Sequence, residues 1–430
     1  GNAFPVYLGA ASLGVGCGHL LAAVNAGIPS SSVNREGKPS GIVYKIEHDA
    51  VMGKACYVRM FSGELKNRDS VLLRGREVPE KVSQIRTVTG KKALDSGRVV
   101  SGDIAAVYGL SQGRVGDVFG NPPEIVQSHL AQPLFRVQAV PKNPEELSQL
   151  HRALEELAEE DPLLGLEWVN EEQELNVKIT GMIQLEVLSA LLQERYHLSA
   201  GFSTPTVIYQ ETPLKAGYGF EAYTMPKPCW AVVKFWIEPG PRGSGLVYRS
   251  EVSENDILRR YQNHIEASVP ETLKQGLYGW EVTDLSVTLV EGEYHVFHTH
   301  PLDFFVATPM ALMDGLQRCG TTLLEPMLRM RISSGEEILG KVIGDLLEMR
   351  GEFDNPVIHG SQFTLEATVP VATSMEFPVR LGILSSGKAV VSSRFDGYRP
   401  CPLELGETAK RRGVNPLDRS KWILQARGAL

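Results

Sequence analysis

Short alternating runs of apolar and polar residues dominate the chain between residues 41 and 117. The runs are separated by turns rich in Gly, Asp and Asn, and none of them repeats at helical spacing. Regular short strands of this kind are typical of a closed β-barrel, so we predict a β-barrel domain over residues 34–130. The candidate strands are Gly41–Glu47, Ala55–Phe61, Ser70–Leu73, Lys81–Thr89 and Ile104–Tyr108.

The pattern then changes to strands mixed with amphipathic helices. Residues 131–204 predict the order strand, helix, strand, strand, helix, strand, which is the ferredoxin-like βαββαβ arrangement. Asn143-Pro144, followed by Glu145 and Glu146, signals the start of the first helix. The predicted segments are Leu134–Val140, Asn143–Glu159, Leu166–Asn170, Leu175–Ile179, Gln184–Tyr196 and Leu198–Phe202.

Residues 321–405 predict the same ferredoxin-like order a second time. Met327–Ile332 alternates as a strand, and Ser334 is a candidate N-cap with Glu336 and Glu337 in the first helical turn. Apolar residues at helical spacing follow, and Gly351 is the expected C-terminal stop. The remaining segments of this unit are Ser361–Val369, Ser374–Leu384 and Lys388–Phe395.

Three further segments complete a multidomain α/β fold class. Residues 205–320 predict an α/β domain between the two ferredoxin-like units. Residues 1–33 predict a strand and a helix, and residues 406–430 a C-terminal helix. The expected elements are strands Phe4–Leu8, Ala231–Ile237 and Val282–Val290, and helices Leu20–Ala26, Asn255–Gln275 and Ala307–Cys319.

The composition limits the possible partners. A formal net charge of −8 over 430 residues argues against nonspecific nucleic-acid binding by the whole surface. Local patches stay possible, and the tail is the most basic stretch. It is open to two interpretations, an RNA contact or the solvated charged face of a terminal helix. The candidate RNA-contacting residues are Lys410, Arg411, Arg412, Arg419 and Lys421.

No run of about 18 apolar residues is present, so we expect no membrane span. The five scattered cysteines form no CxxC pair and favour free thiols in the cytoplasm.

Two motifs that would support catalysis are missing from the sequence. GxxxxGK[ST] and HExxH do not occur. Without the first of these, the phosphates and Mg²⁺ of GTP have no backbone cradle, so we expect this chain to have no catalytic residue and no cofactor. His295, His298 and His300 have a spacing that Zn²⁺ could use, but only Glu293 and Asp303 are near them in sequence, and we predict no metal site.

An aromatic, His-rich loop is the strongest candidate for a binding site. Tyr294, His295, Val296, Phe297 and His298 lie between a predicted strand and a predicted helix, with acidic flanks. This composition suits stacking on unpaired RNA bases better than phosphate binding. The alternative is a hydrophobic loop folded onto its own domain.

Several stretches resemble a known family. Residues 324–354, LEPMLRMRISSGEEILGKVIGDLLEMRGEFD, resemble the fifth domain of elongation factor G and of the tetracycline-resistance ribosomal protection proteins of the Tet(M)/Tet(O) type. Gly181-Met182 with Leu185-Glu186, the helix end Glu194-Arg195-Tyr196 and Pro205-Thr206-Val207 resemble the third domain. Gln275–Trp280 and the tail helix resemble the ribosomal protection branch. The order of the predicted domains is similar to domains II to V over nearly the whole chain.

The resemblance implies a monomeric, cytoplasmic protein that binds the bacterial ribosome at the decoding centre, small-subunit rRNA helix 34 and the stalk base. It places Tyr294–His298 at the tip of domain IV, where the family displaces tetracycline, with Pro241, Arg242 and Gly243 as a supporting loop. GTP and Mg²⁺ would belong to a GTPase domain that precedes the barrel in the family. Residues 1–33 would be the last strand and helix of that domain, and Ala10, Ala11 and Ser12 its final guanine-contacting turn.

Two other functions compete with drug displacement. Tyr294-His295 is more similar to elongation factor G, whereas Val296-Phe297-His298 stands where Tet(M)-like tips carry Ser-Pro-Val. This departure keeps an elongation factor G-like translocation factor as an alternative. A non-ribosomal protein that reuses these folds is the third possibility, and it predicts no ribosome association.

Overall fold

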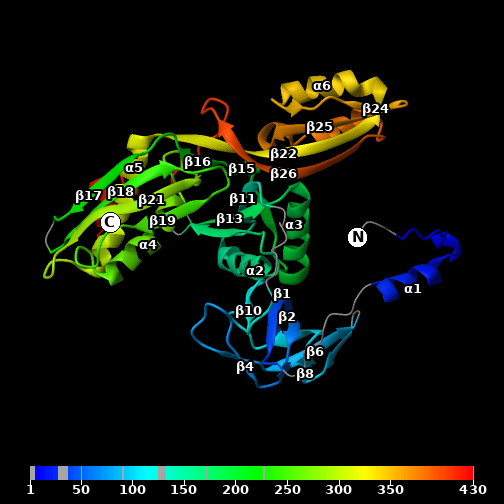
Figure 1. Ribbon diagram of the computed structural model, residues 1–430, viewed down its shortest axis with the longest axis horizontal. Coiled ribbons are helices and arrows are strands. Elements are labelled where there is room, and N and C mark those ends of the chain that lie inside the picture. The colour runs from blue at the N-terminus through cyan, green and yellow to red at the C-terminus, as the bar shows by residue number, and fades with distance from the viewer. Residues whose placement is uncertain are drawn as a thin grey trace. The chain divides into compact units, whose positions relative to one another are not determined.

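The computed structural model describes residues 5–27, 37–49, 51–89, 92–123, 132–169, 173–225 and 228–429 (Figure 1). The chain divides into two compact units. The first comprises Gly1–His129 and Leu154–Pro162, and the second comprises Leu130–Ala153 and Leu163–Leu430.

The N-terminal segment contains one helix and no strand among its described residues. The predicted helix is confirmed, because α1 spans Cys17–Gly27 and follows a 3₁₀ turn, η1, at Ala11–Leu13. The predicted strand Phe4–Leu8 is wrong in its described part: Phe4 lies outside the described residues, and residues 5–9 have no strand structure. The only described backbone pairing of this segment is the isolated bridge between Ala10 and Val15, so these apolar residues lack a neighbouring strand.

The strands of the β-rich domain in the first unit enclose its main hydrophobic core, which includes Val58, Ile85 and Val107. Its main sheet has the order β10-β1-β2-β9-β6-β7, and β3-β8 and β4-β5 form two small sheets. A bridge between Leu73 and Phe119 joins the segment after β4 to β10. The strands missed from sequence, β3, β7, β8 and β10, are two to four residues long, too short to show a pattern. The bounds are β1 Ser40–Asp49, β2 Gly53–Ser62, β3 Glu64–Lys66, β4 Ser70–Val71, β5 Glu80–Lys81, β6 Gln84–Thr89, β7 Lys92–Asp95, β8 Arg98–Val100, β9 Ile104–Tyr108 and β10 Val118–Phe119.

The first ferredoxin-like unit is confirmed by its sheet. The antiparallel order β12-β13-β11-β14 is that of a βαββαβ fold, and β15 adds to β11. The side chain of Asn143 accepts a hydrogen bond from the N–H of Glu145 at 3.2 Å, which confirms the predicted helix start. The bounds are β11 Phe135–Pro141, η2 Pro144–Glu146, α2 Leu147–Glu160, β12 Leu166–Val169, β13 Glu174–Ile179, α3 Met182–Tyr196, β14 Ala200–Phe202 and β15 Thr206–Val207.

The next domain is a four-stranded sheet of order β17-β18-β21-β19 packed against two helices. Strand β19 runs parallel to β21, and the other pairs are antiparallel. Helix α5 begins six residues before the predicted start, because Pro301 opens it and His300 caps it. The bounds are β17 Gly217–Tyr223, β18 Ala231–Pro239, β19 Leu246–Ser250, α4 Arg259–Leu273, β21 Leu285–Tyr294 and α5 Pro301–Cys319.

The second ferredoxin-like unit is built on the longest strand, β22. Figure 1 shows β22 and β26 as two long neighbouring ribbons that reach from β16 to the sheet beneath α6. Helices α6 and α8 each bury one apolar side in a core shared with β22 and β25, through Val342 and Leu346 of α6 and Phe377 and Leu381 of α8. The bounds are β16 Gln210–Pro213, β20 Glu281–Val282, β22 Thr321–Gly335, η3 Glu336–Ile338, α6 Leu339–Glu348, β23 Glu352–Phe353, β24 Val357–His359, β25 Gln362–Pro370, α7 Val371–Ser374, α8 Phe377–Leu384 and β26 Val390–Cys401.

Both predicted ends of the first helix in this unit need correction. Ser334 is not an N-cap: it is buried in β22 opposite Phe363, and the helix starts with the 3₁₀ turn η3. At the other end the left-handed residue is Arg350, with φ 60°, and not Gly351. Glycine is needed at 351 for space, since a Cβ there would lie 2.7 Å from Cγ1 of Val369.

The last helix, α9, spans Arg419–Ala426. Among the described residues, no helix is both long and apolar enough to cross a membrane.

Candidate functional site

The loop between β21 and α5 is closed by its own hydrogen bonds. The N–H groups of His298 and Thr299 donate to the carbonyl of His295 at 3.2 and 3.0 Å. The His295 N–H donates to Oγ1 of Thr299 at 2.7 Å, and the rings of His295 and His298 stack with centroids 4.5 Å apart. Val296 and Phe297 extend into solvent with 74% and 83% of their surface exposed. These two side chains are therefore not folded onto their own domain.

Tyr294 is more buried than Val296 and Phe297. It packs against the hydrophobic core of the domain, with its ring centroid 5.9 Å from that of Tyr261. On the other side of the loop, the ring of Trp230 lies 5.5 Å from His295. The loop thus presents Val296 and Phe297 on a base of packed aromatic rings.

Asp303 is the polar anchor beneath this loop. The residue is 1% exposed, and its Oδ2 accepts the N–H groups of His300 and Trp230 at 2.9 and 3.1 Å. Its Oδ1 accepts Nη2 of Arg427 at 3.3 Å. Sequence reasoning missed this role and that of Trp230. The sequence signal was weak: Pro301 opens the helix and Asp303 lies in its first turn, but His-Pro-Leu-Asp lacks the Ser or Thr and the Glu or Gln of the usual capping box.

The tail helix docks on the same domain. Ile423 is buried in the core shared with α4 and α5, and Nε1 of Trp422 donates to the carbonyl of Val306 at 3.0 Å. Arg419 donates to Glu221 at 3.1 Å. The helix is therefore anchored through one of its sides, while Arg419 and Lys421 on the other side stay exposed.

Residues 407–413, which we call the strap, run along the loop Gln275–Trp280. Nε1 of Trp280 donates to the carbonyl of Glu407 at 2.6 Å, and the N–H of Ala409 donates to the carbonyl of Tyr278 at 2.9 Å. Gly279 has φ +83°, and a Cβ there would lie 2.2 Å from the carbonyl oxygen of Ala409. A side chain at 279 would therefore displace the strap.

The two arginines of the strap bond to different elements, Arg411 to the loop Gln275–Trp280 and Arg412 to β12. Nη1 of Arg411 donates to the carbonyls of Gln275 and Gly276, both at 3.1 Å. Nη1 of Arg412 donates to Glu167 of β12 at 2.9 Å, and Nζ of Lys178 lies 3.0 Å from the other oxygen of the same carboxylate. Burial opposes ionisation of Glu167, but Lys178 and then Arg412 offset it, so the pKa of Glu167 lies below its ordinary value. Arg411, Arg412 and Arg419 thus bond within the chain, and RNA contact by the tail stays a prediction.

The loop Gln275–Trp280 owes its shape to Glu211, which is fully buried. Its two carboxylate oxygens accept the N–H groups of Leu277, Tyr278 and Trp280 and the hydroxyl of Thr321, at 2.8 to 3.1 Å. Burial raises the pKa of Glu211 although these four donors oppose the rise. Nothing in the sequence around Glu211 indicated this role.

The predicted supporting loop, Pro241, Arg242 and Gly243, follows β18 and lies at the end of the β18–β21 pair that is far from the tip. In the β18–β21 register, Ala231 pairs with Tyr294 beside the tip, whereas Pro239 pairs with Leu285. Ten residues of β21 therefore separate this loop from the tip, roughly 30 Å of strand. Arg242 instead donates to the buried Asp284 at 3.3 Å. The support comes from Trp230 and Asp303.

The candidate guanine turn forms a small exposed structure. Ala10 pairs with Val15 through two backbone hydrogen bonds of 3.0 and 3.2 Å, and Ala11 and Ser12 lie in η1. Ala11 and Ser12 are both exposed. The proposed contact with guanine stays a prediction.

Metal-ligating groups are not brought together in the part of the chain that the structure describes. No three His, Cys, Asp or Glu residues there could share an ion. His295 and His298 face each other in a ring stack, and His300 takes part in the helix cap.

Comparison with protein families assigns most of the chain. The model for elongation factor G domain 2 matches residues 38–121, that for domain III matches 130–204, that for domain IV matches 205–320, and that for the elongation factor G C-terminus matches 322–409.

Individual relatives match along nearly the whole chain. The tetracycline resistance protein TetP of Clostridium perfringens is 35% identical and covers 100% of this chain and 66% of its own length. TetM of Neisseria meningitidis is 31% identical, covering 98% of this chain and 66% of its own. TetO of Streptococcus pneumoniae is 31% identical, covering 93% and 63%. A crystal structure of a protein from Thermus thermophilus aligns with a TM-score of 0.49 at 26% identity, over 95% of this chain and 61% of that one.

The chain spans just under two thirds of the length of these relatives. Its matched domains follow one another in the order of elongation factor G. From these matches and the sheet topologies above, the chain belongs to the elongation factor G-like family that includes the tetracycline resistance proteins TetP, TetM and TetO.

Proposed function

We propose that this chain is the ribosome-binding body of a tetracycline-resistance ribosomal protection protein. It acts as a cytoplasmic monomer and binds the bacterial ribosome at the decoding centre and the stalk base. The domain IV tip reaches small-subunit rRNA helix 34 and displaces tetracycline sterically. In the intact protein, GTP hydrolysis with Mg²⁺ in a GTPase domain drives release, while the domains described above provide binding.

The exposed pair Val296 and Phe297 carries this proposal. Large apolar side chains exposed to this degree contribute little to the stability of their own domain, whereas base stacking on an aromatic ring contributes about 1–3 kcal/mol to RNA binding. The loop beneath them is held by the Thr299 bonds and by Asp303, so little ordering would be required on binding.

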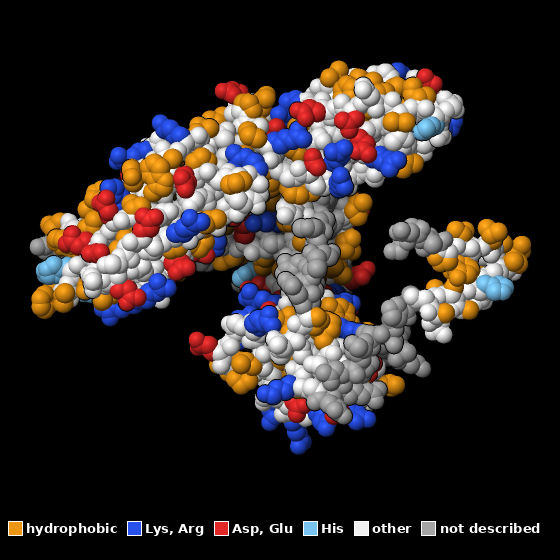
Figure 2. Space-filling model, in the orientation of Figure 1, with side chains coloured by type: hydrophobic (Ala, Val, Ile, Leu, Met, Phe, Trp, Pro, Cys, Tyr) orange, Lys and Arg blue, Asp and Glu red, His pale blue; other side chains and the backbone are white. Residues whose placement is uncertain are grey.

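The distribution of charge favours contact through this tip over broad electrostatic binding. Figure 2 shows Lys and Arg side chains interspersed with Asp and Glu over the visible face of the second unit. A surface of this kind supplies weak nonspecific attraction to rRNA, so specific stacking must provide a larger share of the affinity.

An elongation factor G-like translocation factor remains the second candidate function. The observation that favours it is the tip itself, where Val296-Phe297-His298 replaces the Ser-Pro-Val run of Tet(M)-like tips. The two functions differ in their effect on bound drug. Tetracycline release without stimulated translocation supports the first, and the reverse supports the second.

Co-sedimentation with bacterial ribosomes tests the shared part of both functions. The chain should pellet with 70S ribosomes, with TetM as the positive control. Absence of any association, while TetM pellets, would leave two explanations: the GTPase domain is required for affinity, or these folds have a non-ribosomal role. The same assay with the GTPase domain restored and a non-hydrolysable GTP analogue separates the two.

A further inference from the structure

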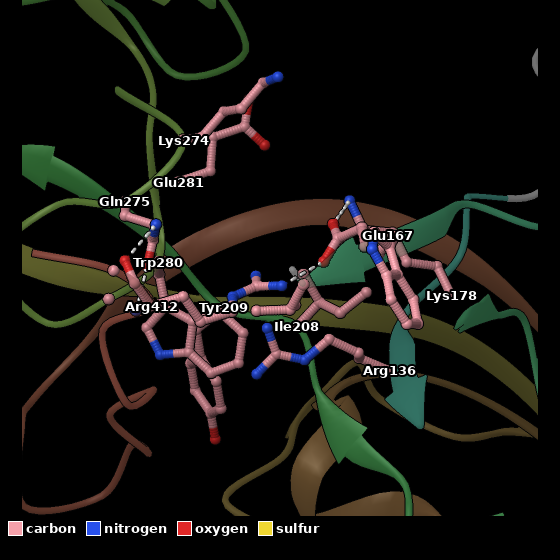
Figure 3. Close-up of a pocket in the computed structure, with 14 residues that line it drawn as sticks. Arg136, Glu167, Lys178, Ile208, Tyr209, Lys274, Gln275, Trp280, Glu281 and Arg412 are labelled. Atoms are coloured by element: carbon pink, nitrogen blue, oxygen red, sulfur yellow. Dashed lines mark hydrogen bonds and ion pairs between the residues drawn. The ribbon is translucent and has the colours of Figure 1, made fainter. Parts of the chain in front are cut away.

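A cavity of about 620 Å³ lies where the first ferredoxin-like sheet, the loop Gln275–Trp280 and the strap meet (Figure 3). This volume falls within the roughly 300–1,000 Å³ of small-ligand sites. The cavity is not used by the function proposed above. The charged side chains that line the cavity are four cations and two carboxylates: Arg136, Lys178, Lys274, Arg412, Glu167 and Glu281.

Arg136 is the unusual member of this lining. It stands directly opposite Lys178 in the β11–β13 register, and like charges in that position repel each other. Lys178 and Arg412 share the carboxylate of Glu167, as the dashed lines in Figure 3 show. Among the described residues, nothing accepts a hydrogen bond from the guanidinium of Arg136, which lies 5.1 Å from the ring centroid of Trp280.

The surroundings of Arg136 disfavour the charged form of its guanidinium. The side chain is half-buried, and burial, followed by the charge of Arg412, lowers the pKa of Arg136. No nitrogen of Arg136 is both buried and unpaired, so water reaches its donors, and an anion that replaces this water would form charge-assisted hydrogen bonds with the guanidinium. Glu167 forms no hydrogen bond with Arg136 in this structure, and its two oxygens bond Arg412 and Lys178 instead.

We propose that this cavity is a binding site for a phosphate-bearing anion, held by Arg136, Lys178 and Arg412. A phosphate group fits this set better than a carboxylate, because it has more oxygens and up to two negative charges, and guanidinium forks bind it in pairs of hydrogen bonds. The phosphate comes either from a small free anion or from the backbone of RNA.

Binding at this site would also act on the strap. Arg412 bonds to Glu167 through its side chain and to Gln275 through its main chain, so an anion that engages its guanidinium adds a contact to the same junction. A bound phosphate should therefore slow hydrogen exchange at the N–H of Ala409 and Arg412.

Calorimetric titration of the full chain with inorganic pyrophosphate tests the proposal. Saturable binding is expected, and R136Q should weaken it by about tenfold, since it removes charge-assisted hydrogen bonds. R249Q removes an exposed arginine of β19 in the same unit and is the matched control, expected to bind as the wild type does. If near-ultraviolet circular dichroism shows that R136Q is misfolded, K178Q takes its place with the same expectation.

The source of the phosphate is separated by a competition arm. A short single-stranded RNA that displaces pyrophosphate from the wild type identifies the site as one for backbone phosphate, whereas failure to displace it identifies a site for free anions. The proposal is overturned if pyrophosphate shows no saturable binding, or if R136Q, or K178Q in its place, binds as tightly as the wild type. Because ribosomes are absent from the assay, its result is independent of the proposed function.

Discussion

Arg412 and Glu167, 245 positions apart in the chain, are joined by a hydrogen bond of 2.9 Å. This bond ties the strap to β12, while Gln275 holds the main chain of Arg412 through both atoms of its amide group. The basic tail that looked like a surface for RNA is, at this point, a structural connection between domains of the second unit.

A double-mutant cycle at this pair should show coupling. Arg412→Gln and Glu167→Gln should each speed hydrogen exchange at the N–H of Ala409 and Arg412. The loss of protection free energy in the double variant should be smaller than the sum of the two single losses. We expect a coupling energy of about 1 kcal/mol for this part-buried pair. The control cycle uses Arg399 and Glu352, an exposed ion pair of 2.7 Å, whose coupling should be near zero. Strictly additive single effects at Arg412 and Glu167 would show that the bond contributes nothing.

The same pair predicts a pH dependence. The pKa of Glu167 is lowered in the folded chain, because Lys178 and Arg412 outweigh the effect of burial. A carboxyl with a depressed pKa stabilises the fold above its unfolded value of about 4.3, and this contribution disappears as the pH falls through the folded pKa. Protection of the strap N–H groups from hydrogen exchange should therefore fall below about pH 4.3 in the wild type. In Glu167→Gln this pH dependence should be absent. Equal acid sensitivity of the two proteins would point to another group.

Phe297→Ala should weaken ribosome binding without altering stability. Its ring is 83% exposed, so its loss removes a stacking contact of about 1–3 kcal/mol, roughly five- to 150-fold in the dissociation constant. Phe220→Ala removes a ring of the same domain that is 48% exposed and serves as the control. Binding is measured by co-sedimentation and stability by thermal unfolding. A fall of many degrees in the melting temperature of Phe297→Ala would mean that the ring is packed in solution.

Asp303→Asn should destabilise the base of the tip. The change removes the charge that accepts N–H groups from His300 and Trp230 and pairs with Arg427, and it should cost about 1–3 kcal/mol. Thermal unfolding and hydrogen exchange at Trp230 and His300 measure the effect. Asp314→Asn is the matched control. Asp314 accepts hydrogen bonds from the N–H of Phe220 and from Nε of Arg318, away from this loop. Unchanged exchange at Trp230 in Asp303→Asn would contradict the anchoring role.

Local patterns predicted most of the architecture, because periodicity depends on neighbours in sequence. The β11 to β14 order and the helix opened by Asn143 were visible in this way. Ser334 was misread because a Ser before two Glu residues looks like a cap, while its actual place in β22 is set by pairing with Phe363.

The parts that sequence could not provide depend on distant contacts. The run Gln275–Trp280 stood out, but its role as the platform for the strap requires Glu211 and residue 409 to be near it. The tip was found from its composition, whereas Arg427 beneath it lies 124 positions beyond Asp303. The position of the predicted supporting loop depends on the pairing of β18 with the distant strand β21, which no single segment of the sequence reveals.

Chemical probing of small-subunit rRNA helix 34 tests directly whether the domain IV tip enters the tetracycline site. Ribosomes are probed with and without tetracycline, in the presence of the wild type or Phe297→Ala. The wild type should change the reactivity of helix 34 and reverse the tetracycline footprint, and Phe297→Ala should do so only at higher concentration. An unchanged helix 34 pattern on ribosomes to which the chain is bound would contradict a tip that enters the drug site.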